Sequence, residues 1–101
     1  MLFRSQIGLD PTTGQFDSET DVDMQAKRVM QNIEALLTAS GLTWDHVVKS
    51  SIFLKDMNDF PKVNAIYGSH FNQGKYPARE TVQVSRLPKD ALVEISVICV
   101  K

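Results

Sequence analysis

Arg79 and Glu94 are the two charged side chains of this sequence whose types and surroundings could support chemistry. Each lies in a valine-rich run of alternating residues, at 76–86 and at 91–97, which is typical of a β-strand. An arginine guanidinium can bind a carboxylate through two charge-assisted hydrogen bonds, and a glutamate in a partly apolar site can orient or deprotonate a water molecule. Such a pair could hydrolyse a small molecule that carries a carboxylate.

The segment Leu87–Asp90 separates these two strands and contains the Pro and Asp that favour turns. If the strands pair antiparallel around it, Gln83 lies opposite Glu94, with Thr81 and Arg79 further along the same face. We therefore expect one guanidinium, one hydroxyl and one carboxylate to converge. A structural ion pair between Arg79 and Glu94 that closes the hairpin is an equally good interpretation, because such pairs also occur without function.

The residues before this hairpin predict further strands and helices in alternation. In chain order they are a strand at Leu2–Ile7, a helix at about 20–40, a strand at 47–55 and a helix from Phe60 to near Gly74. Within the second strand, Val48, Ile52 and Leu54 are expected to share the face that packs on a helix. Two helices on one face of a mixed sheet would form a two-layer α+β domain that spans residues 1–101.

The longer helix has clear start and stop signals. Its apolar residues recur at the i, i+3, i+4 spacing of an amphipathic helix. Ser18 or Thr20 can cap its start, and Gly41 can end it.

The composition excludes several classes of function. Eleven Lys and Arg residues balance twelve Asp and Glu residues, the net charge is −1, and no basic run forms a phosphate-binding surface, so nucleic acid is not the expected partner. His46, His70 and Cys99 lack metal-ligand spacing, so we expect no metal. The single cysteine and the absence of a long apolar run or signal peptide predict a soluble protein with no membrane partner. A cytoplasmic location is favoured, and a mitochondrial one stays open.

Several segments carry a resemblance to a known family. They are Gln6–Pro11, Val47–Lys49, Phe53–Phe60, Val63-Asn64, Pro77–Lys89 and Val93–Ile95. The signature P-A-R-x-T/C-V-x-V-x-x-L-P-K is specific, and the match covers essentially the whole sequence. On these motifs the sequence resembles the RidA/YjgF family of enamine/imine deaminases, also called the endoribonuclease L-PSP family.

This resemblance implies a fold, an assembly and a reaction. The fold would be chorismate-mutase-like, and the assembly a homotrimer with active sites in clefts between subunits. No cofactor would be needed to hydrolyse small 2-imino acids to 2-keto acids and ammonia. By resemblance, Arg79 would bind the substrate carboxylate, Glu94 would position the attacking water, and Asn64 and Thr81 would contact the substrate.

The sequence also departs from the family pattern. Ser5 stands where the family has a glycine whose missing Cβ lets the ligand approach, so we include Ser5 among the substrate-binding residues. The family pattern begins with a further β-hairpin of roughly two dozen residues, so we expect an N-terminally shortened fold that lacks one wall of the cleft. Two other functions stay open: an RNA-directed role as ribonuclease or translation inhibitor, and a non-catalytic trimer that binds small carboxylates.

Overall fold

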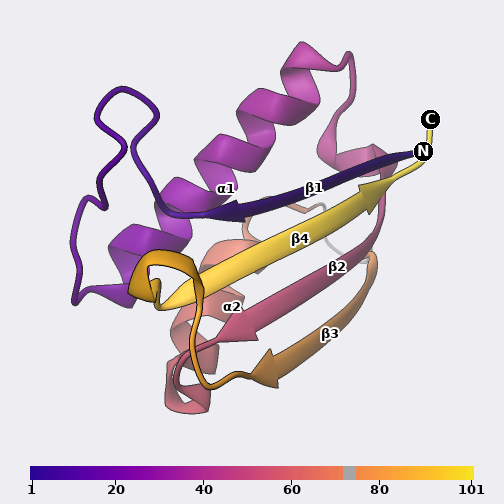
Figure 1. Cartoon of the computed structure of the whole chain (residues 1–101). Coiled ribbons are helices and arrows are strands. Elements are labelled where there is room, and N and C mark those ends of the chain that lie inside the picture. Colours follow the sequence, from indigo (N-terminus) through magenta and orange to yellow (C-terminus); the bar gives the residue numbers. More distant parts are fainter. Residues whose placement is uncertain (72–74) are drawn as a thin grey trace.

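Two helices pack on one face of a four-stranded sheet in the computed structural model, which describes residues 1–71 and 75–101 (Figure 1). The elements are β1 (Leu2–Ile7), α1 (Val22–Ala39), β2 (Val47–Leu54), α2 (Phe60–Gly68), β3 (Ala78–Gln83) and β4 (Val93–Cys99), with short 3₁₀ turns at Trp44–His46, Met57–Asp59 and Pro88–Asp90. The strand order is β1-β4-β2-β3. Strands β2 and β3 are parallel, whereas β4 is antiparallel to both of its neighbours. The predicted α+β class is confirmed.

Helix α1 buries one apolar stripe and has caps at both ends. Asp21 caps its start by accepting hydrogen bonds from the backbone N–H groups of Asp23 and Met24, so the predicted cap at Ser18 or Thr20 is wrong by a few residues. Gly41 follows the helix at φ 71°, a left-handed conformation that glycine adopts without strain, and it ends the helix as predicted. The second helix, α2, ends at Gly68; its predicted end near Gly74 lies outside the described residues.

Strand β4 lies in the middle of the sheet and supplies much of the core. Val93, Ile95 and Val97 alternate along it toward the helices and have no solvent exposure, which confirms the predicted alternation. The prediction for Val48 is wrong, because a register irregularity between Val47 and Lys49 leaves Val48 48% exposed and buries Val47 instead.

The predicted hairpin of β3 and β4 is wrong, because β2 lies between these two strands (Figure 1). Helix α2 connects β2 to β3, and a helical crossover of this kind places two strands in parallel. The connection at 84–92 then passes the end of β2, where the N–H of Val84 donates to the carbonyl of Leu54 and the N–H of Lys55 donates to that of Leu92. The end of β2 thus forms backbone hydrogen bonds on both sides.

A close backbone contact fixes α1 against the end of β1. A Cβ atom added to Gly8 would lie 2.6 Å from the backbone oxygen of Gln25, so only glycine fits here without a shift. The Gln25 side chain is itself buried. Its Nε2 donates to the carbonyl of Ser18 at 2.9 Å, and its Oε1 accepts from the N–H of Leu92 at 2.8 Å. Gln25 therefore links the loop before α1 to the start of β4.

We predict that Gly8→Ala lowers the free energy of unfolding by about 1–3 kcal/mol, because the new methyl group overpacks the contact with α1. Equilibrium unfolding in urea measures the change. Gly68→Ala is the matched control: Gly68 lies in α2, and apart from the helix's own backbone no atom of the described residues beyond its chain neighbours lies within 4 Å of an added Cβ, so this substitution should leave stability unchanged or raise it. Equal losses in both variants would contradict the role of the close contact.

Candidate functional site

Arg79 lies on the edge strand β3 and is held by side chains of α2. Its Nη1 donates a hydrogen bond to Oδ1 of Asn64. Its Cζ atom lies 5.3 Å from the ring centroid of Phe60 and 5.4 Å from that of Tyr67, within the range of cation–π contacts. Phe60, Asn64 and Tyr67 are spaced i, i+4 and i+7, so they form one row along the helix.

A cavity of about 630 Å³ opens beside this guanidinium. It is lined by Asn64, Ala65, Tyr67, Gly68, Ser69, Tyr76, Pro77 and Arg79. Within residues 1–71 and 75–101, no carboxylate lies within 4 Å of the Arg79 guanidinium, whereas Arg28 and Arg86 both have acidic partners. The charge of Arg79 is therefore available to an anionic ligand.

The hydroxyl of Tyr67 connects the helix to the sheet beneath this cavity. It donates a hydrogen bond to Oγ of Ser50 at 2.9 Å. Both residues are buried, with relative exposures of 2% for Tyr67 and 0% for Ser50. Burial raises the pKa of the Tyr67 phenol above its usual value, although the positive charge of Arg79 opposes the rise.

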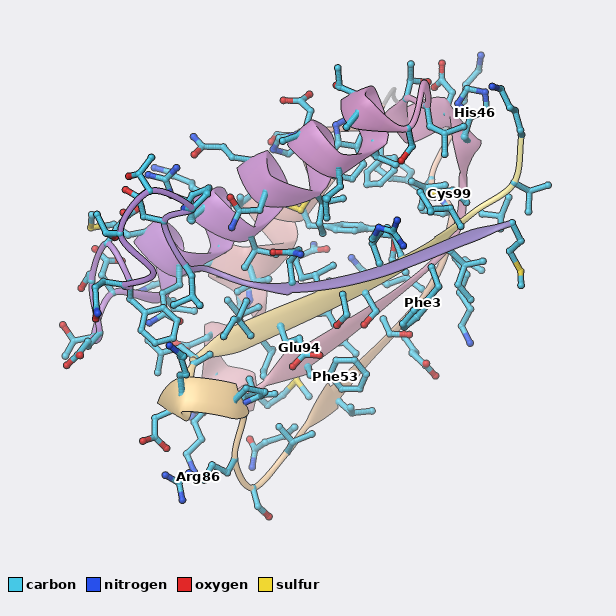
Figure 2. All side chains as sticks on the ribbon, turned by 45° about the horizontal axis from the view of Figure 1, so that its top comes forward. Phe3, His46, Phe53, Arg86, Glu94 and Cys99 are labelled. Atoms are coloured by element: carbon cyan, nitrogen blue, oxygen red, sulfur yellow. The ribbon has the colours of Figure 1, made fainter. Side chains whose placement is uncertain are left out.

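Glu94 lies on the opposite face of the sheet, which neither α1 nor α2 covers. Figure 2 shows Glu94, Phe53 and Phe3 on the side of the sheet that is turned away from the helices. Oγ of Ser5 donates to Oε2 of Glu94 at 2.7 Å, and Oγ of Ser96 donates to Oγ of Ser5 at 2.9 Å. A chain of hydrogen bonds across β1 and β4 thus ends at the carboxylate.

The predicted convergence of Arg79 and Glu94 within one chain is therefore wrong. Arg79 pairs with Ser50 of β2, and Glu94 pairs with Phe53 of the same strand. Ser50 and Phe53 are three residues apart, so their side chains point to opposite faces. The alternative interpretation, an ion pair between Arg79 and Glu94, fails for the same reason.

Thr81 shares the helix-side face of β3 with Arg79, as the alternation predicts. Its Oγ1 is buried and has no hydrogen-bond partner in the part of the chain that the structure describes. The five predicted site residues thus form two groups. Asn64, Arg79 and Thr81 lie on the helix side, whereas Ser5 and Glu94 lie on the open face.

Sequence reasoning missed the residues that support these two groups. Phe60 and Tyr67 fit the apolar spacing of a helix that packs on a sheet, which accounts for them without a site, although their i, i+7 spacing around Asn64 could indicate a shared contact. Ser50 and Ser96 carried no sequence signal, because buried serines in strands have many structural roles.

A sequence model described as "Endoribonuclease L-PSP" matches residues 1–101. The chain belongs to the endoribonuclease L-PSP family. A RutC family protein of Synechocystis is 53% identical over 95 residues, which cover 94% of this chain and 73% of that protein. The 2-iminobutanoate/2-iminopropanoate deaminase of Salmonella typhimurium is 43% identical over 98 residues, covering 95% of this chain and 75% of that protein.

Solved structures of this family share the fold. The crystal structure of Escherichia coli TdcF with bound serine superposes with a TM-score of 0.89 at 39% identity, covering 98% of this chain and 79% of that chain. In the described segments, no helix is both long and apolar enough to cross a membrane. The same segments contain no cluster of three or more His, Cys, Asp or Glu residues arranged to hold a metal ion.

We predict that the raised pKa of Tyr67 makes the free energy of unfolding fall at high pH. The unfolded chain ionises this phenol near pH 10, whereas the folded protein keeps it protonated to higher pH. Its contribution to the free energy of unfolding is thus fully present below about pH 10 and is lost as the pH rises through the folded-state pKa. Urea unfolding between pH 8 and 11 should show a shallower decline for Tyr67→Phe than for the exposed control Tyr76→Phe. Identical declines would contradict this assignment.

Proposed function

We propose that this protein is a cofactor-independent deaminase that hydrolyses small 2-imino acids, such as 2-iminopropanoate and 2-iminobutanoate, to 2-oxo acids and ammonia. The observation that carries the proposal is the Arg79 guanidinium, which is positioned beside a cavity and has no acidic partner in the described segments. A guanidinium in this state suits the carboxylate that every 2-imino acid carries. A relative 43% identical to this chain is named for the same reaction.

The proposed reaction assigns one role to each charged group. Arg79 holds the substrate carboxylate, with Asn64 and Thr81 beside it. Glu94 accepts a proton from water as the water oxygen bonds to the imine carbon, and it passes this proton to the imine nitrogen, which becomes an amine. Glu94 then accepts the hydroxyl proton of the carbinolamine and passes it to the departing nitrogen, so that the C–N bond breaks, ammonia leaves and the C=O bond of the 2-oxo acid forms. Water supplies the oxygen, and no oxidant or cofactor takes part.

Two copies of the chain are needed to build this site, because Arg79 and Glu94 lie on opposite faces of one sheet. The open face carries large apolar side chains that a second copy would cover, among them Phe3 at 57% exposure and Val82 at 41%. In the proposed homotrimer, the β3 edge of one copy meets the open face of the next, so Arg79 of one subunit shares a ligand with Ser5 and Glu94 of its neighbour.

The charges of the open face disfavour the RNA-directed alternative. Glu94 lies on this face together with Glu80, which accepts a hydrogen bond from Ser51 and pairs with Lys49. Two carboxylates on the surface next to the proposed ligand would repel a phosphate backbone, and the net charge of −1 provides no compensating attraction. Binding of carboxylates without turnover is the remaining alternative, and the following experiment separates it from catalysis.

We predict that the protein accelerates the release of 2-oxo acid and ammonia when a serine or threonine dehydratase generates the imine and semicarbazide competes for it. Arg79→Ala should reduce this acceleration at least about tenfold, because a charge-assisted bidentate contact with the substrate carboxylate is lost. Arg86→Ala is the control, since Arg86 is an exposed arginine paired with Asp90 outside the cavity, and it should keep full activity. Unchanged trapping with the native protein would refute the deaminase proposal.

We also predict complementation between two inactive variants. Arg79→Ala and Glu94→Gln damage opposite halves of a shared site, so co-expressed chains should form some sites that contain both native residues. Random assembly of a cyclic trimer would restore about a quarter of the native sites. Each variant expressed alone is the control and should stay inactive. No recovery in a mixed trimer, with its composition verified by native mass spectrometry, would show that the site is not shared between subunits.

A further inference from the structure

We infer that Phe60 and Tyr67 are positioning residues that orient the Arg79 guanidinium for carboxylate capture, and that Ser50 holds Tyr67 in place for this purpose. The inference rests on the proposed function of Arg79. It assigns these three residues a role in substrate affinity in addition to their role in the core.

The location of Arg79 explains why its side chain would need positioning contacts. The residue is exposed and lies on β3, which is the edge strand of the sheet that residues 1–71 and 75–101 form. An exposed arginine samples many rotamers and loses that freedom when it binds a ligand. Contacts that restrict the side chain before binding reduce this loss and so raise affinity.

The contacts on Arg79 leave its binding edge free. Asn64 accepts from Nη1, and the aromatic rings of Phe60 and Tyr67 interact with the guanidinium through their π electrons. Among the described residues, none accepts a hydrogen bond from Nε or Nη2. The donors Nε and Nη2 are one of the pairs that can bind both oxygens of a carboxylate.

Ser50 connects the strand next to Arg79 with the aromatic ring of Tyr67. It is the direct register partner of Arg79 on β2, and its Oγ accepts from the Tyr67 hydroxyl at 2.9 Å. The Tyr67 ring is therefore fixed to the strand beside the one that carries Arg79. A shift of α2 along the sheet would break the hydrogen bond to Ser50 and both aromatic contacts together.

The test compares variants by their kinetic constants for imine hydrolysis. Phe60→Leu should raise KM by about threefold to tenfold, with kcat changed less than about twofold, because one cation–π contact with the bound form of Arg79 is lost. Phe60→Tyr, which retains an aromatic ring, should restore the native KM. Tyr67→Phe keeps the ring but releases it from Ser50, so its KM should lie between that of the native protein and that of Phe60→Leu.

The control and a direct binding measurement separate positioning from packing. Phe16→Leu makes the same change at a partly buried phenylalanine in the loop before α1, and its KM should stay native. A purely structural role for Phe60 would lower thermal stability and active fraction while KM stays unchanged, and that result would overturn the inference. A raised KM for Phe60→Leu together with a native KM for Phe60→Tyr would support the inference.

Binding of 2-oxobutanoate, measured by calorimetry, distinguishes failure of this inference from failure of the proposed function. If the native protein binds the acid without hydrolysing imines, the proposed function fails, and the same variants then test the inference through the dissociation constant. If Phe60→Leu and Tyr67→Phe bind 2-oxobutanoate as tightly as the native protein does, the inference fails, whatever the outcome for catalysis.

Discussion

Strand β2 separates the two charged residues on which the proposed chemistry depends. It pairs in parallel with β3 on one side and antiparallel with β4 on the other. The register of these two pairings places Arg79 and Glu94 on opposite faces of the sheet. A single chain therefore presents the proposed anion-binding half of the site on the helix side and the carboxylate half on the open face. The proposed assembly, the proposed roles of Arg79 and Glu94, and the exposed apolar side chains of the open face are consistent with one another if two copies share a ligand.

Each half of the proposed site is held by side-chain hydrogen bonds, and loss of one partner would leave a polar group without a hydrogen bond and destabilise the fold. On the open face, Ser96 and Ser5 pass a chain of hydrogen bonds to Glu94. On the helix side, Tyr67 and Ser50 satisfy each other within the core. Hydroxyl groups in these positions lose hydrogen bonds to water on folding, so a partner of defined geometry is required. The same requirement restricts the orientation of the charged groups that they support.

The sequence predicted the elements and most faces of the strands, with Val48 as an exception, because alternation and helical spacing are local properties. Val93, Ile95 and Val97 are buried together as expected, and Gly41 ends α1. Strand neighbours are not local: the turn residues at 87–90 indicated a hairpin, although the chain there crosses the end of β2. The motif residues could be grouped by family resemblance, but their division between two faces required the sheet order.

The edge position of β3 has a consequence for the behaviour of the protein in concentrated solution. An unpaired strand edge is a template on which other chains can add strands and aggregate, and proteins commonly protect such edges with charges and prolines. Here Pro77 precedes the strand, and Arg79 and Glu80 place opposite charges on its two faces. The arginine proposed to bind substrate thus also places a charge on this edge before any assembly forms, which is the kind of side chain that disfavours the addition of a further strand.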